Sequence, residues 1–164
     1  MSISSVTVKI ICVGKLKERY WRDACAEYAK RLSAFCKFEI QEVEEARVPE
    51  NASPAQIESA LQQEGKRLLE RLPASGMVTA LCIEGKELSS EALAARLDAD
   101  MTAGVSSTVF LIGGSWGLSP EVKQRCDRRI SMSPMTFPHQ LARVMLCEQL
   151  YRAFQINHGG KYHK

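Results

Sequence analysis

Apolar positions along this chain recur with two different periods, and each period predicts one kind of secondary structure. Short runs that alternate or are continuously apolar predict strands at residues 6–14, 37–43, 77–85, 107–114 and 129–133. Apolar residues three or four positions apart predict helices over 18–35, 53–72, 89–104 and 138–156. Ser53 and Ser119, each followed by proline, mark two helix starts, the second of them for a short helix. Apolar strands that alternate with helices predict an α/β domain with a mostly parallel sheet.

Length and composition fit one globular domain. A chain of 164 residues can bury a sizeable core but is short for two independent domains, so residues 1–164 are expected to form a single domain. Hydrophobic residues make up 45% of the chain and charged residues 25%, the balance of a soluble globular protein. No apolar run reaches the roughly 18 residues of a membrane span, and the first run lacks the basic flank of a signal peptide. We therefore expect a cytoplasmic protein.

The cysteines and histidines give no sign of a metal site. Six cysteines are scattered among apolar neighbours with no Cys-x-x-Cys spacing, so we expect reduced thiols packed in the core. His158 and His163 could begin a metal site, but no Cys, Asp or Glu close to them in the sequence supplies a third ligand. No metal is expected.

Positive charge is concentrated toward the C-terminal end. The formal net charge is only +3, from 22 basic and 19 acidic residues. Residues 120–164 hold eight of the basic residues but only three of the acidic ones. A local positive field favours a polyanionic partner such as nucleic acid, although by itself it does not identify one.

The stretch FLIGGSWGLSPE (110–121) carries a buried strand directly into Gly113 and Gly114. Glycines at the carboxyl end of a parallel strand let the backbone approach a ligand, at the edge where open α/β sheets bind ligands. The stretch is not the G-x-G-x-x-G of dinucleotide-binding proteins, and it lacks the Lys-Ser/Thr pair of a P-loop. It predicts either a ligand-binding turn or an ordinary tight turn.

The stretch SMSPMTFPHQLAR (131–143) is a second candidate. Pro134 and Pro138 stiffen a loop between the last strand and the last helix, because proline disfavours the interior of both structures. Such a loop can present backbone N–H and C=O groups to a small molecule, or it can be a plain connection. His139 and Arg143 share a face of the last helix. Apolar residues occupy more than one side of that helix, which predicts contact with another subunit as well as with the sheet.

The last nine residues, INHGGKYHK (156–164), look too polar to fold alone. Behind the Gly-Gly pair, Lys161, Tyr162, His163 and Lys164 have no apolar face to bury. The tail is therefore either a frayed terminus or a segment with a function of its own.

Together these motifs resemble a known family. FLIGGSWGLSPEV, SMSPMTFPHQLARVMLCEQLYRAF and the terminal YHK are similar to the large-subunit ribosomal RNA pseudouridine N3-methyltransferase family. VGKLKERYW (13–21), EGKRLL (64–69) and IEGKELSSEALA (83–94) extend the resemblance over essentially the whole chain. These are small S-adenosylmethionine-dependent enzymes of the SPOUT class. The resemblance implies a homodimer and a C-terminal trefoil knot, which periodicity alone would not propose.

The resemblance also implies where the methyl donor, S-adenosylmethionine, is bound. It is expected to lie bent within the knot, held by the strand end at Leu81, the turn at Gly113 and Gly114, and the loop formed by Met132, Ser133, Pro134, Met135, Thr136 and Phe137. The implied substrate is N3 of a pseudouridine in large-subunit (23S) ribosomal RNA, on the assembled ribosome.

The implied chemistry needs alignment and the removal of one N3 proton, because a methyl group on a sulfonium is already activated. The expected catalytic residues are His163 as proton acceptor, Tyr162 against the base and Arg143 on a phosphate, with water as the alternative acceptor. RNA contacts are expected from His139, Tyr151, Arg152, Lys161 and Lys164.

Two other functions fit parts of the pattern. A non-enzymatic module could bind ribosomal RNA through the basic C-terminal part. A different nucleotide-binding enzyme could use the IGGSWG turn for phosphate, although Ser115 is the only hydroxyl or basic residue in that turn. Binding of S-adenosylmethionine separates the methyltransferase from the RNA-binding module.

Overall fold

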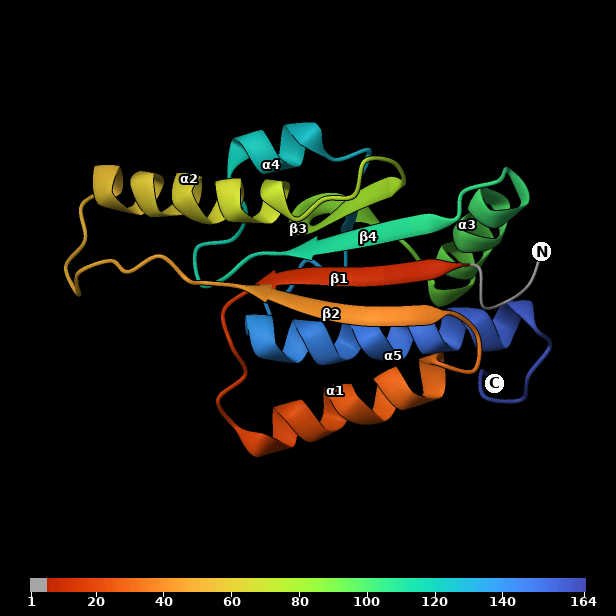
Figure 1. Ribbon diagram of the computed structural model, residues 1–164. Coiled ribbons are helices and arrows are strands. Elements are labelled where there is room, and N and C mark those ends of the chain that lie inside the picture. Colours follow the sequence, from red (N-terminus) through yellow and green to blue (C-terminus); the bar gives the residue numbers. More distant parts are fainter. Residues whose placement is uncertain (1–5) are drawn as a thin grey trace.

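The predicted strands form one parallel sheet in the computed structural model, which describes residues 6–164 (Figure 1). The strands are β1 Thr7–Val13, β2 Lys37–Val43, β3 Met77–Glu87, β4 Ser107–Ile112 and β5 Arg128–Ser131. Their order is β2-β1-β4-β3-β5, and neighbouring strands are parallel. The predicted α/β fold with a parallel sheet is confirmed. Residues 1–5 of the expected single domain lie outside the described residues.

Helices of the described chain cover both faces of the sheet: α1 Arg19–Leu32, α2 Pro54–Glu70, α3 Ser90–Thr102, α4 Pro120–Arg125 and α5 His139–Asn157. Helices α1, α3 and α5 lie on one face, and α2 and α4 lie on the other (Figure 1). Successive strand residues point to opposite faces, so Ile10 packs under the first group and Ile11 under the second. Between residues 6 and 164, no helix is both long and apolar enough to cross a membrane.

Serine caps fix the starts of α2, α3 and α4, at Ser53 and Ser119 as predicted. The Ser53 hydroxyl accepts a hydrogen bond from the Gln56 N–H (3.2 Å), and the Gln56 side chain accepts one from the Ser53 N–H (2.8 Å). This reciprocal capping box satisfies two backbone donors that the helix itself leaves free. Ser89 and Ser119 accept from the third residue of their helices at 3.0 and 3.3 Å.

The larger of the two cores lies between the sheet and the group of α1, α3 and α5. Leu146, Leu150 and Phe154 of α5 are fully buried in it. Helix α5 packs on the sheet and is flanked by both α1 and α3, which accounts for much of its apolar surface (Figure 1). The smaller core lies beneath α2 and α4, where Leu68 and Val122 are buried against the sheet.

The end of β3 folds around β5, and β3 is longer than the predicted 77–85. Leu81 and Lys86 of β3 both pair with Ile130 of β5, on either side of an irregularity in the register. Gly85 lies between them, and a Cβ there would sit 2.5 Å from the carbonyl carbon of Ile130. The last part of β3 therefore encloses the backbone of β5, just before the chain continues into the loop that leads to α5.

Candidate active site

A pocket of about 690 Å³ opens at the carboxyl edge of the sheet. Three segments far apart in the sequence form its wall: β3 from Leu81 onward, the turn after β4, and the loop between β5 and α5. The predicted cofactor residues that line it are Leu81, Gly113, Gly114, Met132, Ser133, Met135, Thr136 and Phe137. Pro134, predicted with them, is exposed and does not line the pocket. The structure thus brings the two candidate loops together at the edge where open α/β sheets bind ligands.

The turn after β4 accommodates only glycine at position 113. A Cβ on Gly113 would collide with the backbone of Gly117, whose Cα would be 2.9 Å away. Gly117 closes the turn by donating its N–H to the Gly114 carbonyl at 3.1 Å, and its φ of 81° favours glycine. The turn therefore presents bare backbone to the pocket, and a ligand can approach it closely.

Two serines give the loop between β5 and α5 a defined course. The Ser131 hydroxyl accepts from the Ser133 N–H at 3.2 Å and donates to the Ser133 carbonyl at 3.0 Å. The Ser133 hydroxyl in turn accepts from the Met135 N–H at 3.0 Å. Such local hydrogen bonds replace those of regular structure. They hold the loop across the pocket, with the side chain of Met135 72% exposed.

A buried acid, Glu64 of α2, stands behind the Gly-Gly turn. Its Oε2 accepts the Ala46 N–H at 3.0 Å, while Oε1 has no hydrogen-bond partner within residues 6–164 and lies 3.9 Å from where a Cβ of Gly114 would be. Burial raises the pKa of this carboxyl above its ordinary value. A buried acid at this position was not predicted, although Glu64 lies four residues from both Ala60 and Leu68 on the buried helix face.

His139, predicted to contact RNA, lies at the start of α5 and lines the pocket. Its Cε1 is 3.9 Å from the position of a Cβ on Gly14, so the connection after β1 borders the pocket as well. Burial lowers the pKa of His139, and the nearby charge of Arg143 lowers it further. At neutral pH His139 is therefore an uncharged imidazole, which can accept a hydrogen bond at the pocket rim.

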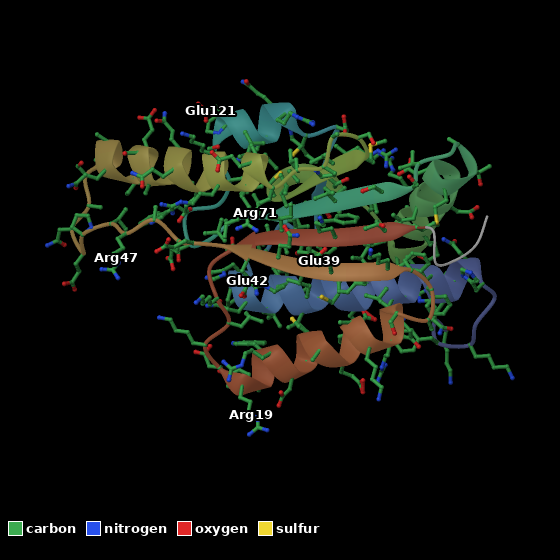
Figure 2. The ribbon with its side chains drawn as sticks, viewed as in Figure 1. Arg19, Glu39, Glu42, Arg47, Arg71 and Glu121 are labelled. Atoms are coloured by element: carbon green, nitrogen blue, oxygen red, sulfur yellow. The ribbon has the colours of Figure 1, made fainter. Side chains whose placement is uncertain are left out.

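Arg143, predicted to hold a phosphate, is only 1% exposed. One terminal nitrogen donates to Glu42 Oε2 at 2.6 Å and the other donates to the Gly14 carbonyl at 3.0 Å. Figure 2 shows Glu42 near the end of β2, beside the start of α5. The guanidinium thus ties the carboxyl ends of β1 and β2 to α5. It lies close to the pocket, yet the fold does not present it to solvent.

The C-terminal tail returns along the surface of α5. The ring of Tyr162 meets the ring of Tyr151 edge-on, with centroids 4.8 Å apart, and the guanidinium of Arg152 lies 4.7 Å from the Tyr162 centroid. The Tyr162 hydroxyl donates to Glu148 at 3.2 Å. Burial raises the pKa of Tyr162 to about 12, so its hydroxyl remains a hydrogen-bond donor at neutral pH.

His163 is held between two charged side chains. Its Nδ1 lies 3.0 Å from Arg152 Nη1, and its Nε2 lies 2.6 Å from Glu91 Oε1 at the start of α3. An arginine can only donate, so Nδ1 accepts from Arg152 and Nε2 carries the hydrogen that is donated to Glu91. In this arrangement both nitrogens of the ring are already engaged.

The tail of this chain lies beside a second hollow rather than in the first pocket. The second hollow, of about 630 Å³, is lined by Glu148, which the tail contacts, and by Val144 and Met145 of the same helix. Ser131 and Met132 line both hollows, which are therefore neighbours. No residue of 158–164 lines the first pocket. The structure groups Tyr162, His163, Tyr151 and Arg152 together and leaves Lys161 and Lys164 exposed.

The described part of the chain contains no metal-binding constellation. Among residues 6–164, no group of three or more His, Cys, Asp or Glu side chains is arranged to hold a metal ion. All six cysteines are free, and Cys12, Cys25, Cys36 and Cys147 are buried, as the sequence predicts for core thiols.

Comparison with known proteins agrees with this geometry. The model of a family described as predicted SPOUT methyltransferase matches residues 6–163. Curated proteins named ribosomal RNA large subunit methyltransferase H are similar over 97% of this chain and 100% of their own length. The protein from Lactiplantibacillus plantarum is 53% identical, that from Ligilactobacillus salivarius 52%, and that from Levilactobacillus brevis 50%.

Proposed function

The chain belongs to the SPOUT methyltransferase family, and we propose that it methylates N3 of a pseudouridine in large-subunit (23S) ribosomal RNA with S-adenosylmethionine as donor. Membership of the family implies that the C-terminal part of the sheet is threaded as a trefoil knot. The enclosure of β5 by the end of β3 fits that threading. The observation that carries the proposal is the pocket at the sheet edge, because it is formed by two of the loops whose motifs resemble the family.

The residues of the pocket fit the proposed donor. Its volume is within the range of small-molecule sites, and its wall combines apolar side chains with unhindered backbone at Gly113 and Gly114. Leu81, Met132 and Phe137 would contact the apolar parts of the donor, and backbone N–H and C=O groups of the two loops would form hydrogen bonds with its polar groups. When bound, the donor supplies a methyl group that a sulfonium sulfur already activates.

The protein then has two tasks: to align the base and to accept its N3 proton. As the bond from N3 to the methyl carbon forms, the bond from that carbon to sulfur breaks, and the proton passes to an acceptor. We assign this proton to His163, with Tyr162 positioned against the base by its ring or its hydroxyl. Water remains the alternative acceptor. In the single chain His163 is engaged by Arg152 and Glu91, so the assignment requires the tail to rearrange.

Formation of a homodimer would cause the tail to rearrange in this way. Val144 and Met145 are only half-buried beside the second hollow, and the tail lies at its edge. A second copy seated on this part of α5 would cover those side chains. The tail of one subunit would then lie near the pocket of the other, where Tyr162 and His163 could meet the target base. We assign Arg143 to the support of the neighbouring loop, since its guanidinium is buried.

RNA contacts are proposed for His139 at the pocket rim and for Tyr151, Arg152, Lys161 and Lys164 along α5 and the tail. A chain of 164 residues offers little surface for recognition, so the proposed substrate is the assembled ribosome in the cytoplasm. On this proposal the neighbouring ribosomal surface supplies part of the specificity.

Calorimetric titration with S-adenosylmethionine tests the proposal at its first step. We expect saturable binding of no more than one donor per chain, with S-adenosylhomocysteine competing and ATP showing no binding. Absence of saturable heat from folded protein would leave an RNA-binding module in place of an enzyme. Binding of ATP instead would favour a different nucleotide-dependent reaction.

A further inference from the structure

The connection between β1 and α1, residues 14–18, lies next to the pocket but has no role in the proposed chemistry. It begins at Gly14, whose φ of 90° favours glycine and whose Cβ position is 3.9 Å from Cε1 of His139 and 3.9 Å from Oε2 of Glu45. Figure 1 shows this connection leaving the sheet on the same side as the connection from β2 to α2. Figure 2 places Arg19, the first residue of α1, on that side of the molecule as well. The connection is thus part of the edge at which the pocket opens.

Two arginines, Arg22 at the surface and Arg143 in the interior, hold the backbone of this connection. Arg22 Nη1 donates to the carbonyls of Leu16 at 3.0 Å and Lys17 at 2.6 Å. Arg143 Nη2 donates to the Gly14 carbonyl at 3.0 Å. The side chain of Leu16 is buried, with the residue 7% exposed. A segment without regular structure is therefore fixed at Gly14, Leu16 and Lys17, and its residues have defined directions.

The outward side of this connection is basic. Lys15 and Lys17 are exposed on either side of the buried Leu16, and neither lysine lies within ion-pair distance of an acid in residues 6–164. Arg19 lies 3.6 Å from Asp23 in an exposed ion pair, so its charge is balanced locally and the positive field of this connection comes mainly from Lys15 and Lys17. Four of the eight residues from 15 to 22 are basic and one is acidic.

An exposed aromatic ring follows the lysines. Tyr20 is 63% exposed, and it lies against Trp21 with ring centroids 4.9 Å apart. An exposed tyrosine gains nothing from the core, and its ring face offers a stacking surface for a base. Cations that hold phosphates, beside an aromatic ring that stacks on a base, are the combination by which proteins bind single-stranded nucleic acid.

We propose that Lys15, Lys17 and Tyr20 form a docking site for single-stranded RNA that flanks the target nucleotide. The inference rests on the proposed function, because it takes ribosomal RNA as the substrate. The two lysines bind successive phosphates, and Tyr20 stacks on an unpaired base beyond the pocket rim. These three residues come from the N-terminal part of the chain and add to the RNA contacts proposed for α5 and the tail.

A matched pair of double variants tests the site. Lys15→Gln/Lys17→Gln removes two charges at the pocket edge, and Lys30→Gln/Lys37→Gln removes two exposed lysines at the opposite end of the sheet. Binding to unmodified large ribosomal subunits is measured over a range of salt concentrations, together with the KM for subunits and the affinity for S-adenosylmethionine. Tyr20→Leu is measured in the same way.

We expect the Lys15/Lys17 variant to bind subunits about tenfold more weakly and to lower the slope of log affinity against log salt by about 1.4, since each phosphate contact to a single strand contributes roughly 0.7. Tyr20→Leu should cost about tenfold without changing the salt slope. None of these variants should change the affinity for S-adenosylmethionine. The Lys30/Lys37 variant should bind subunits as the wild-type protein does. Equal losses of subunit binding in both double variants would show that only the overall charge matters, and this would overturn the docking site.

The binding measurement also separates this inference from the proposed function. If wild-type protein methylates ribosomal RNA and the Lys15/Lys17 variant binds and reacts normally, the docking site is wrong and the function stands. If wild-type protein transfers no methyl group, but the Lys15/Lys17 variant binds subunits more weakly than wild-type protein does, the docking site stands and the proposed reaction is wrong. Normal subunit binding by folded Lys15/Lys17 variant overturns the site whether or not methyl transfer is seen.

Discussion

Deletion of residues 161–164 is expected to abolish methyl transfer while the fold and the binding of S-adenosylmethionine persist. The tail adds no residue to either core, and no residue from 158 onward lines the pocket. The deletion removes Tyr162 and His163, to which we assign the base and its proton, together with Lys161 and Lys164, which we propose as RNA contacts. Loss of proton transfer and alignment together should lower the rate by at least about 10²-fold.

Single-turnover methyl transfer and donor titration measure the two halves of this prediction. Tyr162→Phe serves as a graded variant: it keeps the edge-on contact with Tyr151 but loses the hydrogen bond to Glu148. Lys66→Gln serves as a control, because it removes an exposed charge from α2, on the other face of the sheet from α5 and the tail. Full activity after the deletion would make the tail a frayed terminus. Loss of donor binding along with activity would make it a structural part of the pocket.

Gly113→Val is expected to weaken the binding of S-adenosylmethionine by about 5- to 150-fold, the range that corresponds to about 1–3 kcal/mol of strain from overpacking. A Cβ at this position meets the backbone of Gly117, and backbone cannot turn aside as a flexible side chain can. The turn must open, and the wall of the pocket moves with it. Calorimetry on protein shown to be folded by its thermal transition measures the loss.

Two glycine variants serve as controls for Gly113→Val. In Gly114→Ala the new methyl would lie 3.1 Å from Cγ1 of Val13, a side-chain atom that can shift by a few tenths of an ångström, so a smaller loss is expected. Gly104→Ala follows α3, where a Cβ meets nothing within 4 Å but the φ of 93° strains alanine. It should lower stability without changing the affinity for the donor. A folded Gly113→Val protein with normal affinity would remove the turn from the site.

The fold class and the position of the pocket could be predicted because they depend on local features. Serine followed by proline at Ser53 and Ser119 fixes two helix starts within a few residues, whatever the rest of the chain does. The glycines at 113 and 114 mark the strand end at which the pocket opens in the same way. The enclosure of β5 could not be predicted, because it depends on a second register between Lys86 and Ile130, far apart in the sequence.

The environment of charged residues was the hardest feature to predict. Arg143 reads as an exposed cation on a helix, yet Glu42 and the Gly14 carbonyl bury it, and both partners lie more than a hundred residues away. A count of charges also points away from the N-terminal part of the chain, because acidic residues there slightly outnumber basic ones. That average conceals Lys15 and Lys17, which are exposed just after Gly14, the neighbour of the pocket residue His139.

Methyl transfer from radiolabelled S-adenosylmethionine to ribosomes from cells that lack this protein tests the central claim most directly. The labelled RNA is digested, and the modified base is mapped and identified. We predict label at a single pseudouridine of the large-subunit RNA, carried on N3. Label on another base, or no label on ribosomes or free RNA from folded protein that binds the donor, would contradict the proposed reaction and leave a methyltransferase with a different substrate.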